Sequence, residues 1–271
     1  MIHGDLPLAD VPLLFLDLET TGLDPRAGHR VAEVALLRTL DSAELSRLES
    51  LVNPGRLLDP EAARVNGLRD ELLAAAPPFA ALAPAVESLA AGAALVGHNV
   101  RFDLAFLDAE LRALGRPGLG GPVLDTLTLS RRLLRRRSYS LGALAAELGL
   151  PPPTHRAMDD VLTTRALFGR LCTLMAELGV TTLGAALRLE RGLAPGTPEP
   201  EPPPLIAQAM AEGRALRILY HSRSSPGPIS RTVRPLYLSV ETSGIYLRAY
   251  CELRQDFRAF ALAKIELVEL L

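Results

Sequence analysis

The chain has 271 residues, a formal net charge of −2 and two cysteines, Cys172 and Cys251. The length allows one large domain or two smaller ones, and the small net charge excludes a polycation, so any nucleic-acid contact must come from local patches. The distant cysteines exclude a disulfide framework or a C-x-x-C zinc site, and no secretory segment or membrane-length apolar run is visible. We therefore expect a soluble, cytoplasmic protein with no membrane partner.

The first predicted elements are three strands. VPLLFLDLET at 11–20 and HRVAEVALLR at 29–38 form adjacent strands joined by a turn, and a third strand within 43–55 ends at Asn-Pro-Gly. Asp17 and Glu19 lie at i and i+2 of the first strand, so they project from the same face. A solvated strand end explains such a pair, and so does a divalent cation held by carboxylate oxygens. Carboxylates elsewhere in the chain decide between the two.

Strands and helices then alternate. Helices are predicted around 60–65 and 79–91, a buried strand at 93–99, an amphipathic helix at 101–115, a strand running into a helix at 121–134, a helix at 140–150 and the longest helix at 157–178. Leu104, Leu107 and Leu111 form an apolar stripe at helical spacing. This order predicts an α/β domain with a mixed sheet flanked by helices.

The chain changes character after residue 190. Residues 191–204 contain six prolines and predict an extended linker. Residues 205–271 alternate with period two and predict a small β-rich domain. The predicted domains, 1–190 and 205–271, differ in charge: the first has 19 arginines against 23 acidic residues, and the second has nine basic residues against six acidic ones.

Further acidic residues occur at the ends of predicted core elements. Asp103 opens the helix that follows GHNVRFD, and THRAMDD opens the long helix with His155, Asp159 and Asp160. Like-charged carboxylates that gather in a dry site repel each other unless cations neutralise them. The sequence thus favours a divalent-metal site over a solvated strand end. Asp159 is expected on the helix surface, and Asp125, which ends another strand, is expected to bond backbone groups.

These motifs, taken in order, resemble the DEDDh 3′→5′ exonucleases, the epsilon-type proofreading family, over residues 11–178. The matching stretches are DLETTG at 17–22, LVNPG at 51–55, VNGL at 65–68, GHNVRFDLAFL at 97–107, LDTLTLSRRL at 124–133, SYSLGALAAELGL at 138–150 and the H-x-A-x-x-D motif of His155, Ala157 and Asp160. Asn66 departs from the histidine that the family carries there.

The resemblance implies an RNase H-like fold and two Mg²⁺ or Mn²⁺ ions. The implied metal ligands are Asp17, Glu19, Asp103 and Asp160, with Asp17 bridging the ions. His155 is the implied general base, because an imidazole that titrates near neutrality suits proton removal from water. Since His155 and Asp160 are five positions apart, we expect the histidine on the loop or first turn and the aspartate inside the helix.

Substrate contacts are less sharply indicated. Thr20, Thr21 and Gly22 form either a turn or, as in the relatives, a backbone that approaches the terminal nucleotide. His98 and Asn99, beside Asp103, are structural or face the substrate. Within Arg131–Arg137, five arginines including Arg131 and Arg135 form either a solvated helix end or a track for nucleic-acid phosphates.

Residues 205–271 resemble a compact WYL domain. Ile245-Tyr246-Leu247 stands where that family has Trp-Tyr-Leu, and the flanking stretches are similar to its other strands. The resemblance implies a small SH3-like or Sm-like barrel, a type associated with nucleic-acid or ligand sensing. Tyr246, Arg248 and Tyr250 share one strand face, which suits either packing at the domain edge or stacking on bases.

Two classes of function follow. The first is a metal-dependent 3′→5′ exonuclease that releases nucleoside 5′-monophosphates from single-stranded 3′ ends, of DNA in replication or repair, or of RNA as the alternative. The second is a non-catalytic nucleic-acid or ligand sensor that keeps the exonuclease fold. All four expected metal ligands and the histidine are present, which favours the enzyme. A polymerase or a repair protein is a possible partner.

Overall fold

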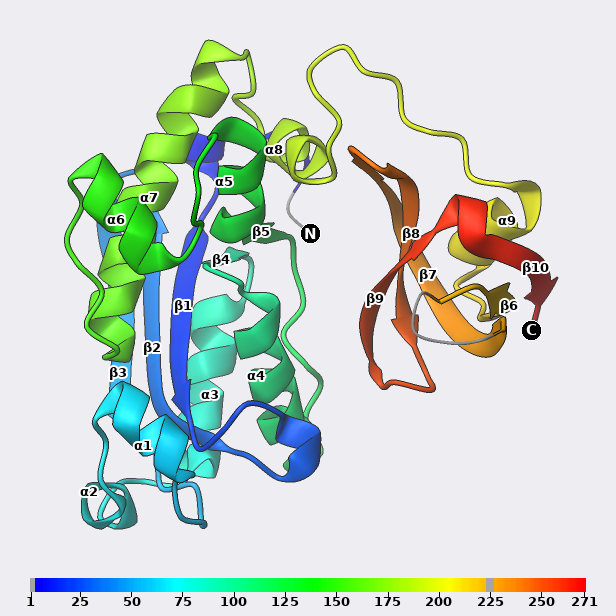
Figure 1. The fold of residues 1–271 in the computed structure, drawn as a ribbon. Helices are drawn as coiled ribbons and strands as arrows, with labels where there is room; N and C mark the ends of the chain where they lie inside the picture. The colour runs from blue at the N-terminus through cyan, green and yellow to red at the C-terminus, as the bar shows by residue number, and fades with distance from the viewer. Residues whose placement is uncertain (1–2, 223–226) are drawn as a thin grey trace. The chain divides into compact units, whose positions relative to one another are not determined.

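The structure, a computed structural model, describes residues 3–222 and 227–271 (Figure 1). The chain divides into two compact units, Met1–Glu190 and Arg191–Leu271. No helix in these described ranges combines the length and the apolar character needed to cross a bilayer.

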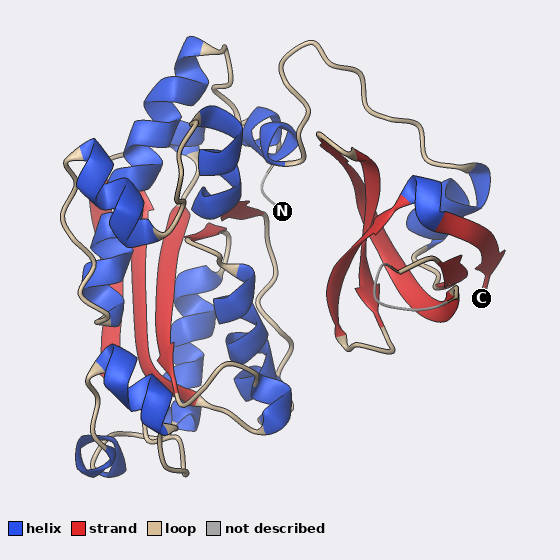
Figure 2. Ribbon diagram, in the orientation of Figure 1, coloured by secondary structure: helices blue, strands red, loops and turns tan. Residues whose placement is uncertain are grey.

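The first unit is built on a five-stranded sheet in the order β3-β2-β1-β4-β5. Its strands are β1 (Leu13–Thr20), β2 (Val31–Leu40), β3 (Ala43–Leu51), β4 (Ala94–Gly97) and β5 (Val123–Asp125). β1 pairs with β2 in the antiparallel sense and with β4 in the parallel sense. The predicted mixed sheet is therefore confirmed, and Figure 2 shows it as the red layer among blue helices.

Eight α-helices surround this sheet within the described residues of the unit. They are α1 (Pro60–Asn66), α2 (Asp70–Ala74), α3 (Phe79–Ala90), α4 (Arg101–Ala113), α5 (Thr126–Leu133), α6 (Leu141–Leu148), α7 (Ala157–Glu177) and α8 (Leu183–Glu190). Neither α2 nor α8 was predicted from the sequence. The segment expected to be one strand-to-helix run contains β5 and α5, and α5 ends at Leu133, before the last arginines of the basic run.

Both faces of the sheet are buried at β1 and β2, and β1 shows how the sequence achieves this. Leu13 and Phe15 pack in a core cluster with residues of α7, whereas Leu14 and Leu16 pack in a second cluster with residues of α3 and α4. Successive side chains of a strand point to opposite faces, so a strand covered on both sides is an apolar run. By the same alternation, the acidic side chains at the end of β1 project toward the α7 face.

The second unit begins with a stretch, 191–203, that has neither helix nor strand. It continues with α9 (Pro204–Glu212), β6 (Leu216–Tyr220), β7 (Ile229–Glu241), β8 (Gly244–Cys251), β9 (Asp256–Ala261) and β10 (Ile265–Leu270). The strands form one antiparallel sheet in the order β10-β6-β7-β8-β9. The predicted β-rich character is thus confirmed.

Two details of this unit differ from the prediction. α9 was not expected, although a proline at its first position and buried Ile206 and Ala209 at i and i+3 favour a helix there. The sheet is also not closed, since β9 and β10 are its two edges and do not pair with each other among the described residues. The structure therefore shows an open antiparallel sheet where the resemblance implied a barrel.

Candidate active site

Asp17 and Glu19 end β1 on the α7 face of the sheet. Both side chains are half-buried, because they continue the core face of Leu13 and Phe15 toward the end of the strand. Antiparallel pairing places Glu33 of β2 directly opposite Glu19. Residues directly opposite on paired strands share a face, so this edge of the sheet carries three carboxylates close together.

Asp103 joins them from the other side of β1. It lies in the first turn of α4, is 4% exposed, and its Oδ1 accepts a hydrogen bond from the backbone N–H of Leu18 at 3.1 Å. This bond ties the N-terminus of α4 to β1 between the two acidic residues of the strand. The positive end of a helix dipole favours a carboxylate at this position.

His155 and Asp160 complete the group. His155 is exposed and immediately precedes the N-cap of α7, whereas Asp160 lies inside that helix and is 8% exposed. Their spacing in the sequence led us to expect this arrangement. Ligand atoms of Glu19, His155 and Asp160 all lie within 4.8 Å of one another, so these three could hold a metal ion together.

The carboxylates repel one another in the protein alone. Burial raises the pKa of Asp17 well above its usual range, and Asp103 and Asp160 raise it further. Burial followed by Asp160 raises the pKa of Glu19 to about 8, and burial also raises the pKa of Asp103 to about 8. Clustered oxygen donors with such raised pKa values are suited to hard divalent cations, which favour the charged form. The residues therefore fit the implied metals.

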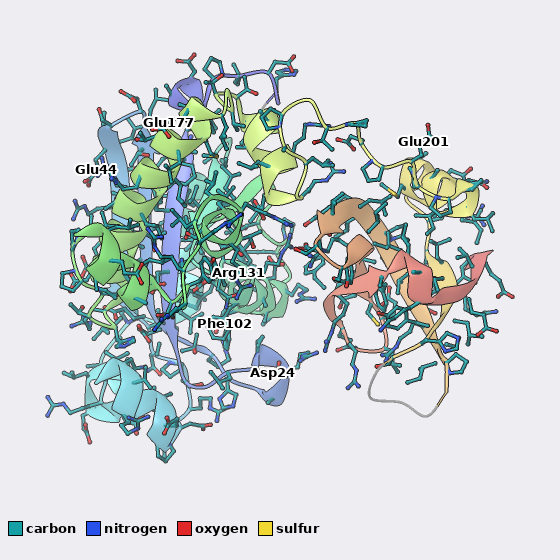
Figure 3. The ribbon with its side chains drawn as sticks, turned by 45° about the horizontal axis from the view of Figure 1, so that its top comes forward. Asp24, Glu44, Phe102, Arg131, Glu177 and Glu201 are labelled. Atoms are coloured by element: carbon teal, nitrogen blue, oxygen red, sulfur yellow. The ribbon has the colours of Figure 1, made fainter. Side chains whose placement is uncertain are left out.

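A cavity of about 410 Å³ adjoins Glu19. Its walls are largely apolar and include Leu23, Val65 and Phe102; Figure 3 labels Phe102 and, on another lining segment, Asp24. His29, which received no role from its sequence context, also lines it. Because Glu19 is among its lining residues, the cavity lies against the acidic edge of the sheet.

The predicted substrate residues at 20–22 have different surroundings. Thr20 and Gly22 line this cavity, whereas Thr21 is fully buried. The Thr20 hydroxyl donates to the Gly22 carbonyl at 2.7 Å, and the Thr21 hydroxyl accepts from the Arg30 N–H at 3.0 Å. Their side chains thus build the turn, and their contact with substrate stays a prediction.

The other predicted substrate residues lie around α5. His98 has partners for both ring nitrogens, Thr126 Oγ1 at 3.0 Å and the Tyr139 carbonyl at 2.9 Å, which is typical of a structural histidine. Asn99 is exposed, as are Arg131 and Arg135. The guanidinium of Arg131, labelled in Figure 3, lies 5.9 Å from the Tyr139 ring centre. A phosphate track through these arginines stays a prediction.

Asp125 is a structural residue, as expected. Its carboxylate accepts from the backbone N–H groups of Asn99 at 2.8 Å and Leu127 at 3.1 Å, and from the Thr128 hydroxyl at 2.9 Å. The second of these bonds caps α5.

The second unit contains a smaller cavity of about 150 Å³. Its described lining residues are Tyr220, Ser222, Arg231, Cys251, Arg254, Arg258, Ala259 and Phe260. Arg231 is 9% exposed, and its Nε has no hydrogen-bond partner among the described residues. Arg248, in contrast, donates to Ser239 and Glu241, both at 2.8 Å. Strand periodicity pointed to Arg248 and missed Arg231, because it does not reveal the burial of an arginine.

Two family models match the chain. A model described as Exonuclease matches residues 14–168, and a model described as WYL domain matches residues 204–270.

Relatives of known name are similar to the first unit. A DNA polymerase III subunit epsilon-like protein of Rhodobacter capsulatus is 34% identical over 195 residues, covering 68% of this chain and 28% of that protein. The DNA polymerase III subunit epsilon of Rickettsia conorii is 34% identical over 178 residues, covering 63% of this chain and 73% of that protein. The chain spans only 14% of a DNA polymerase III PolC-type of Thermotoga maritima, to which it is 29% identical.

A solved structure is similar in the same region. Exonuclease X in complex with 5′ overhanging duplex DNA superimposes with a TM-score of 0.50 at 27% identity, covering 64% of this chain and 97% of that one.

Proposed function

Because the chain belongs to the DEDDh exonuclease family, related to the epsilon subunit of DNA polymerase III, we propose that its first unit hydrolyses DNA from the 3′ end to nucleoside 5′-monophosphates. The observation that carries the proposal is the convergence of the acidic residues of β1, α4 and α7 with His155. A sensor that only kept the fold would have no need to hold several carboxylates in a site where they repel one another.

Members of this family use divalent metals, and four carboxylates here would hold two Mg²⁺ or Mn²⁺ ions. The proposed ligands are Asp17, Glu19, Asp103 and Asp160, and the last three are near enough to Asp17 to raise its pKa. Two ions bound there would stabilise the charge that develops on the attacking water and on the leaving 3′-oxygen. The bound ions, in place of water, would then stabilise the charged form of each carboxylate.

His155 is the proposed general base. It lies beside Glu19 and Asp160, so its ring reaches the space in front of the carboxylates. A ring nitrogen there accepts the proton of the attacking water, and because the side chain is exposed, the proton passes on to solvent.

The cavity beside Glu19 is the proposed place of the 3′-terminal nucleoside. Its apolar walls, including Leu23 and Phe102, suit the face of a base, and the turn at Thr20–Gly22 brings backbone close to the sugar. Arg131 and Arg135 are proposed to contact phosphates further along the strand. The proposed preference for DNA rests on the relatives, which are named as DNA polymerase subunits.

The decisive experiment is digestion of 3′-labelled single-stranded DNA, mismatched duplex DNA and RNA by the purified protein with Mg²⁺ or Mn²⁺. We expect nucleoside 5′-monophosphates, faster from DNA, and no product in EDTA. Asp103→Asn should abolish turnover, whereas Asp108→Asn, which removes a carboxylate from the same helix, should retain it. Full activity of a folded Asp103→Asn protein would contradict the proposal.

The second unit is proposed to bind the nucleic-acid strand as an accessory. The observation in favour is the cavity lined by the buried guanidinium of Arg231, whose Nε has no hydrogen-bond partner among the described residues. Arg231→Met should weaken binding of a long single strand more than Arg217→Met, because Arg217 is exposed and paired with Glu269. A polymerase or repair protein is a further proposed partner, since relatives are polymerase subunits.

A further inference from the structure

An ion pair between the exposed Arg156 and the buried Glu33 lies next to the proposed general base. Arg156 donates through Nη2 to Glu33 Oε1 at 2.7 Å and through Nε to both carboxylate oxygens at 3.1 and 3.2 Å. We infer that this pair is a clamp that holds His155 in its working position, and that Glu33 and Arg156 are positioning residues. The inference rests on the proposed role of His155 as general base.

Glu33 cannot be an ordinary surface acid. It is 1% exposed, and the β1–β2 register places it directly opposite Glu19. Like charges directly opposite each other on paired strands are destabilising, and a buried charge without a partner is more so. Arg156 supplies the compensating charge from a segment 123 residues later in the chain. The pair therefore joins the sheet edge to the entry of α7.

The backbone around His155 is fixed on both sides. Before it, the Thr154 N–H donates to Asp160 at 2.9 Å; after it, the Ala157 N–H donates to the second oxygen of Glu33 at 3.3 Å. His155 itself has a φ of +59°, in the left-handed region that few residues other than glycine adopt. Such a conformation persists only where the surroundings impose it. Here the bonds of Glu33 impose it on the C-terminal side.

This geometry predicts what loss of the clamp does. Without Arg156, the residue at 155 can relax toward an ordinary backbone conformation, which swings the imidazole away from the carboxylates. Asp160 lies inside α7 and keeps its place, so metal binding is retained. A misplaced catalytic group of this kind lowers kcat by about 10- to 100-fold while KM changes little.

The test is a double-mutant cycle of Arg156→Gln, His155→Ala and the two together, assayed for kcat and KM on single-stranded DNA. If Arg156 acts through His155, the double variant is no slower than His155→Ala alone. If Arg156 affects the rate independently of His155, the two losses multiply, and the inference is overturned. Arg156→Lys should recover part of the rate, because lysine keeps the charge but not the two-pronged geometry.

Arg30 and Glu110 provide a matched control. Arg30 pairs with the buried Glu110 through two bonds, at 2.7 and 2.5 Å, and its side chain is 44% exposed against 50% for Arg156. Arg30→Gln should lower the melting temperature by a similar amount to Arg156→Gln and leave kcat near that of the wild type. An equal loss of kcat in both variants would show that stability alone is responsible.

A second readout does not depend on turnover. In metal-free protein, the amides of residues 154–158 should exchange with deuterium faster in Arg156→Gln than in the wild type or Arg30→Gln. The reason is that Arg156 no longer holds the carboxylate of Glu33 in place to accept the hydrogen bond of the Ala157 N–H. Unchanged exchange would overturn the clamp. Failure of the proposed function is distinct: it would appear as full activity of His155→Ala, whatever the Arg156 variants do.

Discussion

The carboxylate of Asp17 is disfavoured in its charged form. Burial raises its pKa well above the usual range, and the neighbouring carboxylates, Asp103 first, raise it further. Asp17→Ala should abolish turnover and leave the fold intact, since it removes a proposed metal ligand and relieves repulsion among the carboxylates. Mg²⁺ or Mn²⁺ should raise the melting temperature of the wild type and do so much less in the variant, because only binding to the folded state stabilises it. Equal metal-induced shifts in the two proteins would argue against this site.

As the proposed general base, His155 is expected to affect the rate of hydrolysis and not the binding of metal ions. His155→Ala should lower the rate by about 10²–10⁴-fold, the usual contribution of a general base, while the metal-induced rise in melting temperature persists. The wild-type rate should increase with pH along an ascending limb that the variant weakens. If both proteins had the same rate at every pH, bulk hydroxide or another group would be the base.

The same carboxylates predict how stability depends on pH without metal. Burial raises the pKa values of Glu19 and Asp103 from ordinary values of 4.5 and 3.8 to about 8, so the folded protein binds more protons than the unfolded chain between these limits. Stability in EDTA should therefore be highest near pH 4–5 and fall as the pH rises toward 8. Asp103→Asn should make the fall shallower. Thermal melts in EDTA across this range provide the measurement, and a rise in melting temperature from pH 5 to 8 would contradict burial of these carboxylates as the cause.

At the scale of the element, the turn between β1 and β2 depends on the close approach of the His29 ring to Gly22. A Cβ atom at Gly22 would lie 2.3 Å from the ring of His29, whose side chain lines the cavity. Gly22→Ala should destabilise the protein by about 1–3 kcal/mol, as overpacking does, and raise KM by distorting the cavity wall. In a His29→Ala background the same substitution should cost much less, which melting temperatures and KM of the four proteins will show. An unchanged cost in that background would mean that backbone and not the ring sets the limit.

At the scale of the molecule, the proposed chemistry lies wholly within the first unit, and the second unit is proposed to contribute binding. A protein ending at Glu190 should fold and cleave short oligonucleotides at the full rate, because the five proposed catalytic residues and both core clusters that cover the sheet belong to residues 1–190. Its KM for long strands should be higher and less sensitive to salt, since the arginines of the second cavity are gone.

The substrate-holding role would be rejected if removing residues 191–271 changed neither the KM for long strands nor its salt dependence. The second unit would then serve a small ligand or a protein partner. The Arg231→Met variant further separates strand binding from binding of a small ligand or a protein partner. Only if the second unit binds the strand should loss of this buried guanidinium raise the KM for long strands.

The sequence by itself determined most of the longer elements and the candidate residues of the site. The alternation along β1 fixes that Asp17 and Glu19 share a face, and helical spacing fixes α4 and α7, because these patterns depend only on near neighbours in the chain. The ordered motifs identified the four carboxylates and His155 as one group. The short helices α2, α8 and α9 escaped prediction. With five residues, α2 has too few turns to show a period, and α9 begins at Pro204, inside the proline-rich stretch that predicted a linker.

Only the tertiary structure decided which distant groups meet. The β1–β2 register sets Glu33 opposite Glu19, and packing of the α7 entry against the sheet brings Arg156 to it; neither follows from local periodicity. Three other features also do not follow from local periodicity: the open edges of the second sheet, the burial of Arg231 and the contact of His29 with Gly22. The physical reason is that register, burial and ion pairing are settled by the free energy of the whole packed unit, whereas periodicity reports only which face of an element is apolar.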